Sequence, residues 1–207
     1  RGVAHGLATS GIVDVVHSPD IHDAGRLFTP PTKAYGRALV ILRHPIERAV
    51  AEYERLRMFD KDVNRMTLEE FARSDHPENN ILTRTLSRQT DSQPLGNIHL
   101  AKAKEILKRK FVVGLFSHME DSLERFETFF GWNIGDQGRI CRSNEVGRAM
   151  SHHYNRVDIS AIINNDGGSV AITTLREKNA MDMALYEFAT FLYDYQGHSL
   201  FGISAVV

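Results

Sequence analysis

Two arginines, Arg43 and Arg48, lie where a run of apolar residues gives way to a predicted helix. A guanidinium at such a turn can bind a phosphate or sulfate through two parallel hydrogen bonds. The start of the helix adds backbone N–H groups and the positive end of the helix dipole. The spacing therefore predicts an anion pocket at the carboxyl end of the strand, where open α/β sheets usually bind ligands. A second interpretation stays open, in which Arg43 pairs with a carboxylate such as Glu47 or Asp14.

Apolar spacing indicates the elements that position these arginines. Residues 38–42 are apolar without alternation, which is typical of a central strand buried on both faces. Pro45 suits the first position of a helix, where its missing N–H costs nothing. The apolar stripe of this helix consists of Ile46, Ala49, Val50, Tyr53 and Leu56. We therefore expect a strand, a short turn that carries Arg43, and a helix.

Capping signals and apolar spacing predict further elements along the chain. These are a short strand at 12–16, a helix capped by Thr67 and Glu70, a basic helix at 98–110, a buried strand at 111–115, a helix from Ser117 and Glu120 to Gly131, and a last helix capped by Thr174 and Glu177. We expect residues 132–168 to be irregular, because Asn, Asp and Gly cluster at their end. Strands that alternate with helices predict an α/β fold, a parallel sheet flanked by helices, in one domain over residues 1–207.

The composition excludes several classes of protein. A formal net charge of −1 argues against a protein that coats nucleic acid. Cys141 is the only cysteine, so the chain has no internal disulfide and no thiolate metal cluster. No apolar run is long enough to span a bilayer, and the start has no signal-peptide pattern. Because the first residue is Arg1 rather than Met, we expect the chain to begin partway through a longer protein.

Residues 39–50 resemble the 3′-phosphate-binding motif of sulfotransferases, enzymes that use 3′-phosphoadenosine 5′-phosphosulfate (PAPS). In that family a strand ends in Arg, Pro follows two residues later, a second Arg three later, and Ser three later still. Arg43, Pro45 and Arg48 match in register, and Ala51 stands where the family has Ser. The resemblance implies that Arg43 and Arg48 bind the cofactor. The missing hydroxyl should weaken nucleotide binding without abolishing it.

Later segments resemble the carbohydrate branch of the family, including the uronyl 2-O-sulfotransferases and algal relatives. These segments are 80–86, which corresponds to a helix beside the acceptor cleft, 102–132 and 175–189. The resemblance implies a P-loop-NTPase-like sulfotransferase fold that lacks its N-terminal part. It also implies transfer of a sulfuryl group from PAPS to a hydroxyl acceptor, a glycan, and a location in the Golgi lumen.

Sulfuryl transfer to an alcohol needs a base for the hydroxyl proton, and histidine suits this role near neutral pH. In the 2-O branch a histidine lies on the strand or loop before the arginine strand, so the resemblance implies His17 as the catalytic base, with His22 as second choice. The alternative is that both are surface loop histidines. His152 and His153 are adjacent but have no third ligand, so we predict no metal site.

The family holds the 5′-phosphosulfate with a loop rich in Lys, Gly and Thr, and neither this loop nor a Walker motif occurs in the chain. We expect the loop either to precede Arg1 or to have been lost. Loss of the loop, together with Ala51, motivates a second hypothesis: a degenerate sulfotransferase fold that is a structural or binding subunit of a larger assembly, for example in an organelle. A nucleotide phosphotransferase is disfavoured, because an acidic magnesium site is also missing.

Overall fold

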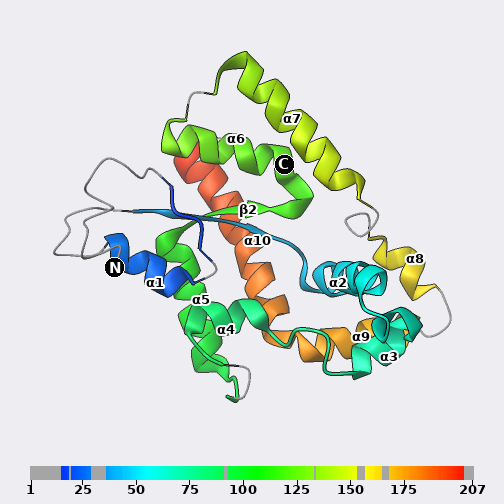
Figure 1. Cartoon of the computed structure of the whole chain (residues 1–207). Coiled ribbons are helices and arrows are strands. Elements are labelled where there is room, and N and C mark those ends of the chain that lie inside the picture. Colours follow the sequence, from blue (N-terminus) through cyan, green and yellow to red (C-terminus); the bar gives the residue numbers. More distant parts are fainter. Residues whose placement is uncertain are drawn as a thin grey trace. The chain divides into compact units, whose positions relative to one another are not determined.

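The computed structural model describes residues 15–18, 20–28, 36–90, 93–132, 134–152, 157–164 and 168–202. The chain forms two compact units, and their helices and strands are labelled in Figure 1. The first unit comprises Arg1–Ala38 with Leu82–Phe111, and the second comprises Leu39–Ile81 with Val112–Val207. The architecture is α/β and mostly helical, with two parallel strands. Among the described helices, none is both long and apolar enough to cross a membrane.

The first unit contains three α-helices within its described residues. These are α1 (Ile21–Gly25), α4 (Ile81–Ser87, whose first residue belongs to the second unit) and α5 (Asn97–Lys110). The predicted basic helix is thereby confirmed. The predicted strand at 12–16 is wrong where it can be compared, because Val15 and Val16 are exposed and have no regular structure. Residues 12–14 lie outside the described part.

The sheet consists of β1 (Ala38–Leu42) and β2 (Phe111–Leu115), which belong to the second unit apart from their first residues. Every residue of β2 is buried, as predicted. In β1 only Leu42 is buried, and Leu39 is 38% exposed. The expectation that β1 is buried on both faces is therefore wrong. Among the described residues, β1 pairs only with β2, so it lies at an edge of the part of the sheet that the structure describes.

Side chains of two helices satisfy backbone groups of β2. The Oε1 atom of Gln196 accepts a hydrogen bond from the N–H of Val113 at 2.9 Å. The hydroxyl of Ser122 accepts from the N–H of Leu115 at 2.9 Å, and it lies 3.1 Å from the carbonyl of the same residue. These contacts attach α6 (Met119–Phe130) and α10 (Ala180–Phe201) to the strand, because a buried backbone N–H needs a partner.

Gly114 has no room for a side chain, because a Cβ there would lie 2.8 Å from both Phe126 Cζ and Ser122 Cβ. We expect Gly114→Ala to displace α6 from β2 and to lower the free energy of unfolding by about 1–3 kcal/mol, as overpacking of a filled core does. Urea unfolding measures the loss. Gly147→Ala is the control, since nothing lies within 4 Å of its Cβ position. Equal stability of the Gly114→Ala variant and the wild type would contradict the close packing described here.

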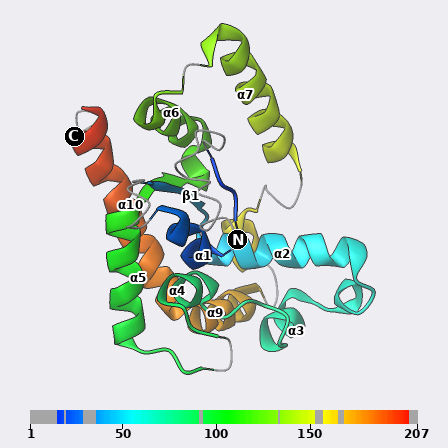
Figure 2. The same cartoon turned by 60° about the vertical axis from the view of Figure 1, so that its left-hand side comes forward.

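The helix after β1 is α2 (Pro45–Phe59), with Pro45 in its first turn as predicted. Its apolar stripe packs against α9 (Gly168–Lys178) and α3 (Leu68–Arg73). The latter two helices lie side by side (Figures 1 and 2). The capping box of Thr67 and Glu70 at the start of α3 is confirmed in both directions. These contacts fix the direction in which α2 leaves the sheet.

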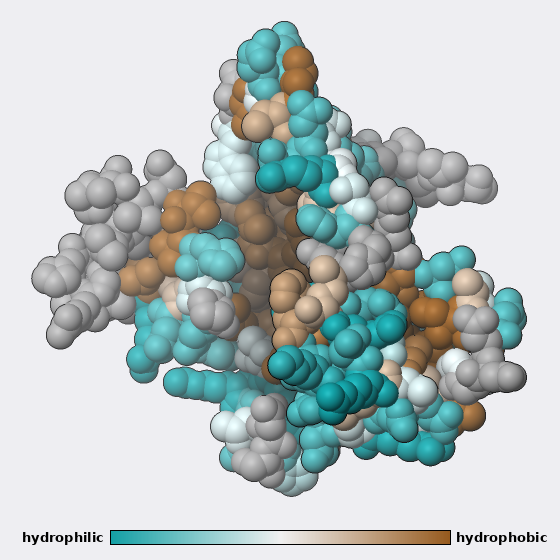
Figure 3. Space-filling model, turned by 45° about the vertical axis from the view of Figure 1, so that its right-hand side comes forward, coloured by the Kyte–Doolittle hydropathy of each residue, from teal (hydrophilic) through white to brown (hydrophobic). Residues whose placement is uncertain are grey.

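The prediction for residues 132–168 is wrong, because the described part of this segment forms α7 (Gly135–Ser151) and α8 (Ile159–Ile163). None of the residues of α7 is buried, and its surface is mainly hydrophilic at the top of Figure 3. The side chain of Arg142 attaches α7 to α6 through ion pairs with Glu120 and Glu127. A helix without a buried stripe gives no apolar period in the sequence.

Two predicted capping boxes are also wrong. Ser117 lies in a 3₁₀ turn, and α6 begins two residues later with His118 at its N-cap. Thr174 lies inside α9, where its hydroxyl donates to the carbonyl of Val170 at 3.0 Å. The single last helix that we expected is in fact α9 and α10, separated at Asn179. The predicted end of α6 is confirmed, because Gly131 has the left-handed φ of 68° that favours glycine.

Candidate functional site

Arg43 lies directly after the last residue of β1 and two residues before the start of α2. Its guanidinium carbon lies 4.4 Å from the ring centroid of Phe116, which directly follows β2. The carboxyl ends of the two parallel strands thus meet at this arginine. Its side chain is 12% exposed. The strand, turn and helix that the sequence predicts around Arg43 are confirmed.

Glu47 lies on the first turn of α2, on the same side as Arg43. The Nε atom of Arg43 and the Oε2 atom of Glu47 are 3.9 Å apart. The two side chains form an ion pair, but their distance is longer than the 2.7–2.9 Å that is usual for a charge-assisted hydrogen bond. Burial lowers the pKa of Arg43 and Glu47 opposes this effect, although an arginine stays charged in proteins. Asp14, the other carboxylate considered as a partner, lies outside the described residues.

His44 follows Arg43 and forms the N-cap of α2 without a side-chain cap. Its ring meets the ring of Tyr186 edge to face, with centroids 5.3 Å apart, and Tyr186 shares a hydrogen bond with Ser117. Burial lowers the pKa of His44; Glu47 opposes this effect and Arg176 adds to it. These effects disfavour the charged form of His44, whereas Arg43 at the same edge of the sheet stays charged.

The buried Nδ1 atom of His44 has no hydrogen-bond partner among the described residues. A buried polar atom without a partner carries a free-energy cost that a ligand or water could remove. The first turn of α2 also has no side-chain cap from its N-cap residue, and the first N–H groups of a helix have no partner within the helix. The uncapped helix start lies two residues after Arg43 and suits an anion more than a cation.

Arg48 makes contacts of a different kind. Its NH2 atom lies 2.9 Å from Oδ2 of Asp182 on α10, and its Nε atom lies 3.3 Å from Oε2 of Glu78. The Asp182 side chain is fully buried, so the arginine provides the countercharge that a buried carboxylate needs. Ala51, one turn further along α2, is buried as well. Arg43 is therefore better placed than Arg48 to meet a ligand.

The two candidate histidines belong to the first unit. His17 is exposed in a segment without regular structure. His22 lies on α1, and its Nε2 atom is 2.9 Å from the carbonyl of Thr85. The catalytic role of either histidine stays a prediction. His152 is exposed and His153 lies outside the described residues; within the described ranges, no group of three or more His, Cys, Asp or Glu side chains could hold a metal.

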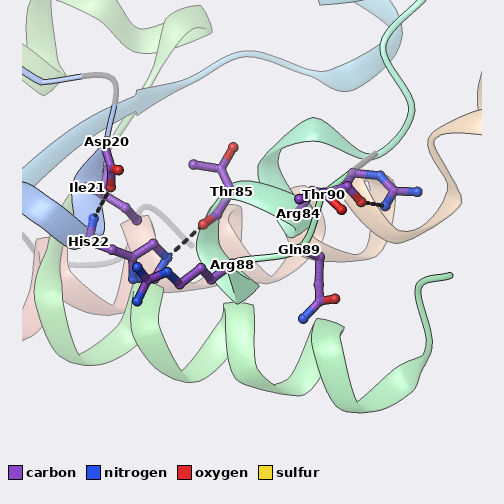
Figure 4. Close-up of a pocket in the computed structure, with 8 residues that line it drawn as sticks. All are labelled: Asp20, Ile21, His22, Arg84, Thr85, Arg88, Gln89 and Thr90. Atoms are coloured by element: carbon purple, nitrogen blue, oxygen red, sulfur yellow. Dashed lines mark hydrogen bonds between the residues drawn. The ribbon is translucent and has the colours of Figure 1, made fainter. Parts of the chain in front are cut away.

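A pocket of about 360 Å³ lies in the first unit, between α1 and the end of α4 (Figure 4). It is lined by Asp20, Ile21, His22, Arg84, Thr85, Arg88, Gln89 and Thr90. Of these residues, only His22 was singled out from the sequence. Arg84 and Thr85 lie within segment 80–86, which the resemblance places beside the acceptor cleft, and Arg88 was not considered. The available signal was the spacing of Arg84 and Arg88, one helical turn apart at the end of this segment.

Comparisons with protein-family models, with curated proteins and with solved structures found no match for this chain. The resemblance to sulfotransferases therefore rests on the motif around Arg43 and on the order of the segments after it. Local geometry can support a binding role for this motif. The reaction itself has to be tested by experiment.

Proposed function

We propose that the chain is the 3′-phosphate-binding and C-terminal part of a PAPS-dependent sulfotransferase with a P-loop-like fold. In this proposal the acceptor is a hydroxyl group of a carbohydrate. The observation that carries the proposal is the place of Arg43, which follows β1, precedes α2 and lies over the ring of Phe116. A cation at the carboxyl end of a parallel strand, backed by the start of a helix, is well suited to bind a phosphate.

The residues of this chain would bind and orient the nucleotide. PAPS itself supplies the activated sulfuryl group, which leaves the phosphate oxygen and joins the oxygen of the acceptor hydroxyl. Arg43 would hold the 3′-phosphate, and the ring of Phe116 would keep the guanidinium in place through a cation–π contact. His17 would take the proton of the acceptor hydroxyl, with His22 as second choice. The chain contains no loop of its own for the 5′-phosphosulfate.

Removal of the guanidinium tests the nucleotide site. We expect adenosine 3′,5′-bisphosphate to bind the wild-type protein in calorimetry, and Arg43→Gln to weaken binding by at least about tenfold, because hydrogen bonds to charged groups are among the strongest. Arg55→Gln is the matched control, since Arg55 lies on the same helix and pairs with Glu52. Thermal unfolding checks that both variants are folded. Equal affinity of wild type and Arg43→Gln would contradict the site.

A second function is favoured by two observations on α2. Ala51 cannot supply the hydroxyl of the family motif, and Arg48 is engaged by Asp182 and Glu78. Both suit a degenerate sulfotransferase fold that serves as a structural or binding subunit of a larger assembly. In that case adenosine 3′,5′-bisphosphate does not bind the wild-type protein, while Arg43→Gln leaves its folding intact. The calorimetric experiment therefore distinguishes the two functions.

A further inference from the structure

In the pocket of the first unit, the ring of His22 and the backbone of Arg88 meet the same backbone carbonyl. Arg88 follows α4 directly, and its N–H lies 3.3 Å from the carbonyl oxygen of Thr85. The Nε2 atom of His22 lies 2.9 Å from the same oxygen. Both side chains line the pocket, one from α1 and one from the turn after α4 (Figure 4). The Thr85 carbonyl thus anchors the ring of His22 and the backbone from which the side chain of Arg88 extends.

The hydrogen bond of His22 also sets the chemistry of its ring. A carbonyl oxygen can only accept a hydrogen bond, so the Nε2 atom of His22 carries the proton. In the neutral ring, the Nδ1 atom is then a hydrogen-bond acceptor. The same arrangement holds metal-bound and catalytic histidines in a defined orientation. His22 therefore presents an acceptor with a fixed direction.

The other charged groups of the pocket are engaged in holding its walls. The carboxylate of Asp20 accepts from the N–H groups of His22 and Asp23, both at 3.0 Å, and caps α1. These backbone hydrogen bonds keep the pKa of Asp20 below its usual value. The NH1 atom of Arg84 donates to two carbonyls in the turn, those of Thr90 at 2.7 Å and Gln93 at 2.8 Å. Arg84 is therefore a positioning residue.

Arg88 differs from these groups. Its side chain is exposed and makes no hydrogen bond or ion pair with the residues that the structure describes. Asp20 attracts it only at longer range, and that carboxylate is already occupied as a cap. The pocket thus offers one cationic hydrogen-bond donor group at Arg88 and, in the neutral ring, one acceptor at Nδ1 of His22. A ligand that matches both has an oxyanion and a hydroxyl close together.

We propose that this pocket binds a small hydroxylated carboxylate. The guanidinium of Arg88 holds the carboxylate through two hydrogen bonds, and the Nδ1 atom of His22 accepts a hydrogen bond from a neighbouring hydroxyl. The volume of about 360 Å³ falls in the range of small-molecule sites. The aliphatic wall formed by Ile21 would cover the carbon chain of such a ligand. This site does not depend on nucleotide binding at Arg43.

The backbone at Arg88 provides a variant that removes the guanidinium while preserving the fold. Arg88 has a φ of 63°, and the N–H of Gln89 donates to the carbonyl of Arg84 at 2.9 Å. This is the hydrogen-bond pattern of a helix end that normally carries glycine. Arg88→Gly should therefore unfold at a temperature equal to or above that of the wild type. Any loss of binding in this variant then comes from the missing side chain.

Calorimetry with three probes tests the proposal. Gluconate carries the carboxylate and the hydroxyls, glucose carries only hydroxyls, and hexanoate carries only the carboxylate. We expect gluconate to bind the wild-type protein at least about tenfold more tightly than either of the other two, because only gluconate uses both Arg88 and His22. We expect Arg88→Gly to lower the affinity for gluconate by at least about tenfold.

Two controls keep the outcome clear. Arg26→Gln removes another exposed arginine of the first unit and should bind gluconate like the wild type, as should Arg43→Gln. Should Arg88→Gly prove less stable than the wild type, Arg88→Asn takes its place, because asparagine also tolerates this backbone conformation. The proposal is overturned by an Arg88→Gly variant that binds gluconate like the wild type, by equal binding of glucose and gluconate, or by no binding of gluconate at all.

Discussion

Replacement of Asn80 by alanine is expected to lower the free energy of unfolding by about 3–5 kcal/mol, one of the largest losses that a single substitution in the second unit should cause. Asn80 is buried and connects the end of α9 with the start of α10. Its Nδ2 atom donates to the carbonyl of Lys178 at 2.7 Å. Its Oδ1 atom accepts from the N–H groups of Met181 and Asp182 at 2.8 and 2.9 Å.

The expected loss has two physical causes. Asn179, the N-cap of α10, makes no side-chain cap, so Asn80 satisfies the first N–H groups of that helix from a distant part of the chain. Alanine would leave these groups buried without partners, at roughly 1–3 kcal/mol for each unsatisfied group. Asn80 also has a φ of 52°, a conformation that asparagine tolerates better than alanine.

Guanidinium chloride unfolding of three variants separates these causes. Asn80→Gly removes the side chain without backbone strain, so it should be less destabilised than Asn80→Ala by about 1 kcal/mol. Asn79→Ala is the matched control, because Asn79 is an exposed neighbour of the same residue type. A loss below about 1 kcal/mol in Asn80→Ala would show that the cap described here contributes little.

The second large loss is expected for Arg48→Met. This substitution removes the countercharge of Asp182, whose side chain is fully buried 2.9 Å from the guanidinium. Breaking a buried ion pair by removal of one partner typically costs about 3–5 kcal/mol, because the remaining charge is desolvated without compensation. Methionine keeps most of the volume of the arginine side chain, so lost packing contributes little. Chemical unfolding measures the difference.

A double variant tests whether the stranded charge is the cause. Asp182→Asn in the Arg48→Met background replaces the buried carboxylate by a neutral amide and should recover part of the lost stability. Arg55→Met is the control, because the pair of Arg55 and Glu52 lies at the surface and should contribute less than about 1 kcal/mol. Additive effects of the Arg48 and Asp182 substitutions would contradict the coupling.

The elements that sequence predicts well are those with a strong local signal. The apolar run of β2, the proline at the start of α2, the capping box of Thr67 and Glu70, and the glycine after α6 all have their cause within a few residues. The same holds for the candidate site, because the place of Arg43 at a strand–helix turn follows from its neighbours alone. The distance between Arg43 and Glu47 cannot be predicted from the sequence in this way.

Local signals fail where they are weak or ambiguous. Residues of α7 include Gly135, Gly138 and Gly147, which lower helix propensity, and none of its side chains is buried. Thr174 followed by Glu177 matches a capping box. Ala171, Ile172 and Leu175 pack into the core, however, and α9 already begins at Gly168, so that Thr174 lies inside the helix. Tertiary packing determines these helices more than the residue pattern does.

Long-range polar contacts leave no trace in the spacing of residues. Arg48 and Asp182 are separated by 134 positions, and Asn80 meets α10 across about a hundred. The left-handed backbone of Arg88 is equally hidden, since most helices that end in this way carry glycine. For these reasons the spacing of residues predicts neither the ion pairs of Arg48 nor the pocket beside His22.

The attachment of α7 to α6 has a consequence for how the second unit responds to its surroundings. Arg142 binds two glutamates of α6, and no residue of α7 is buried. Attraction between partly exposed charges is screened by dissolved ions, whereas burial of apolar surface is not weakened in this way. High ionic strength should therefore loosen this one helix while the hydrophobic interior around α2, α3 and α9 keeps its structure, so that the region behaves as a separately melting segment.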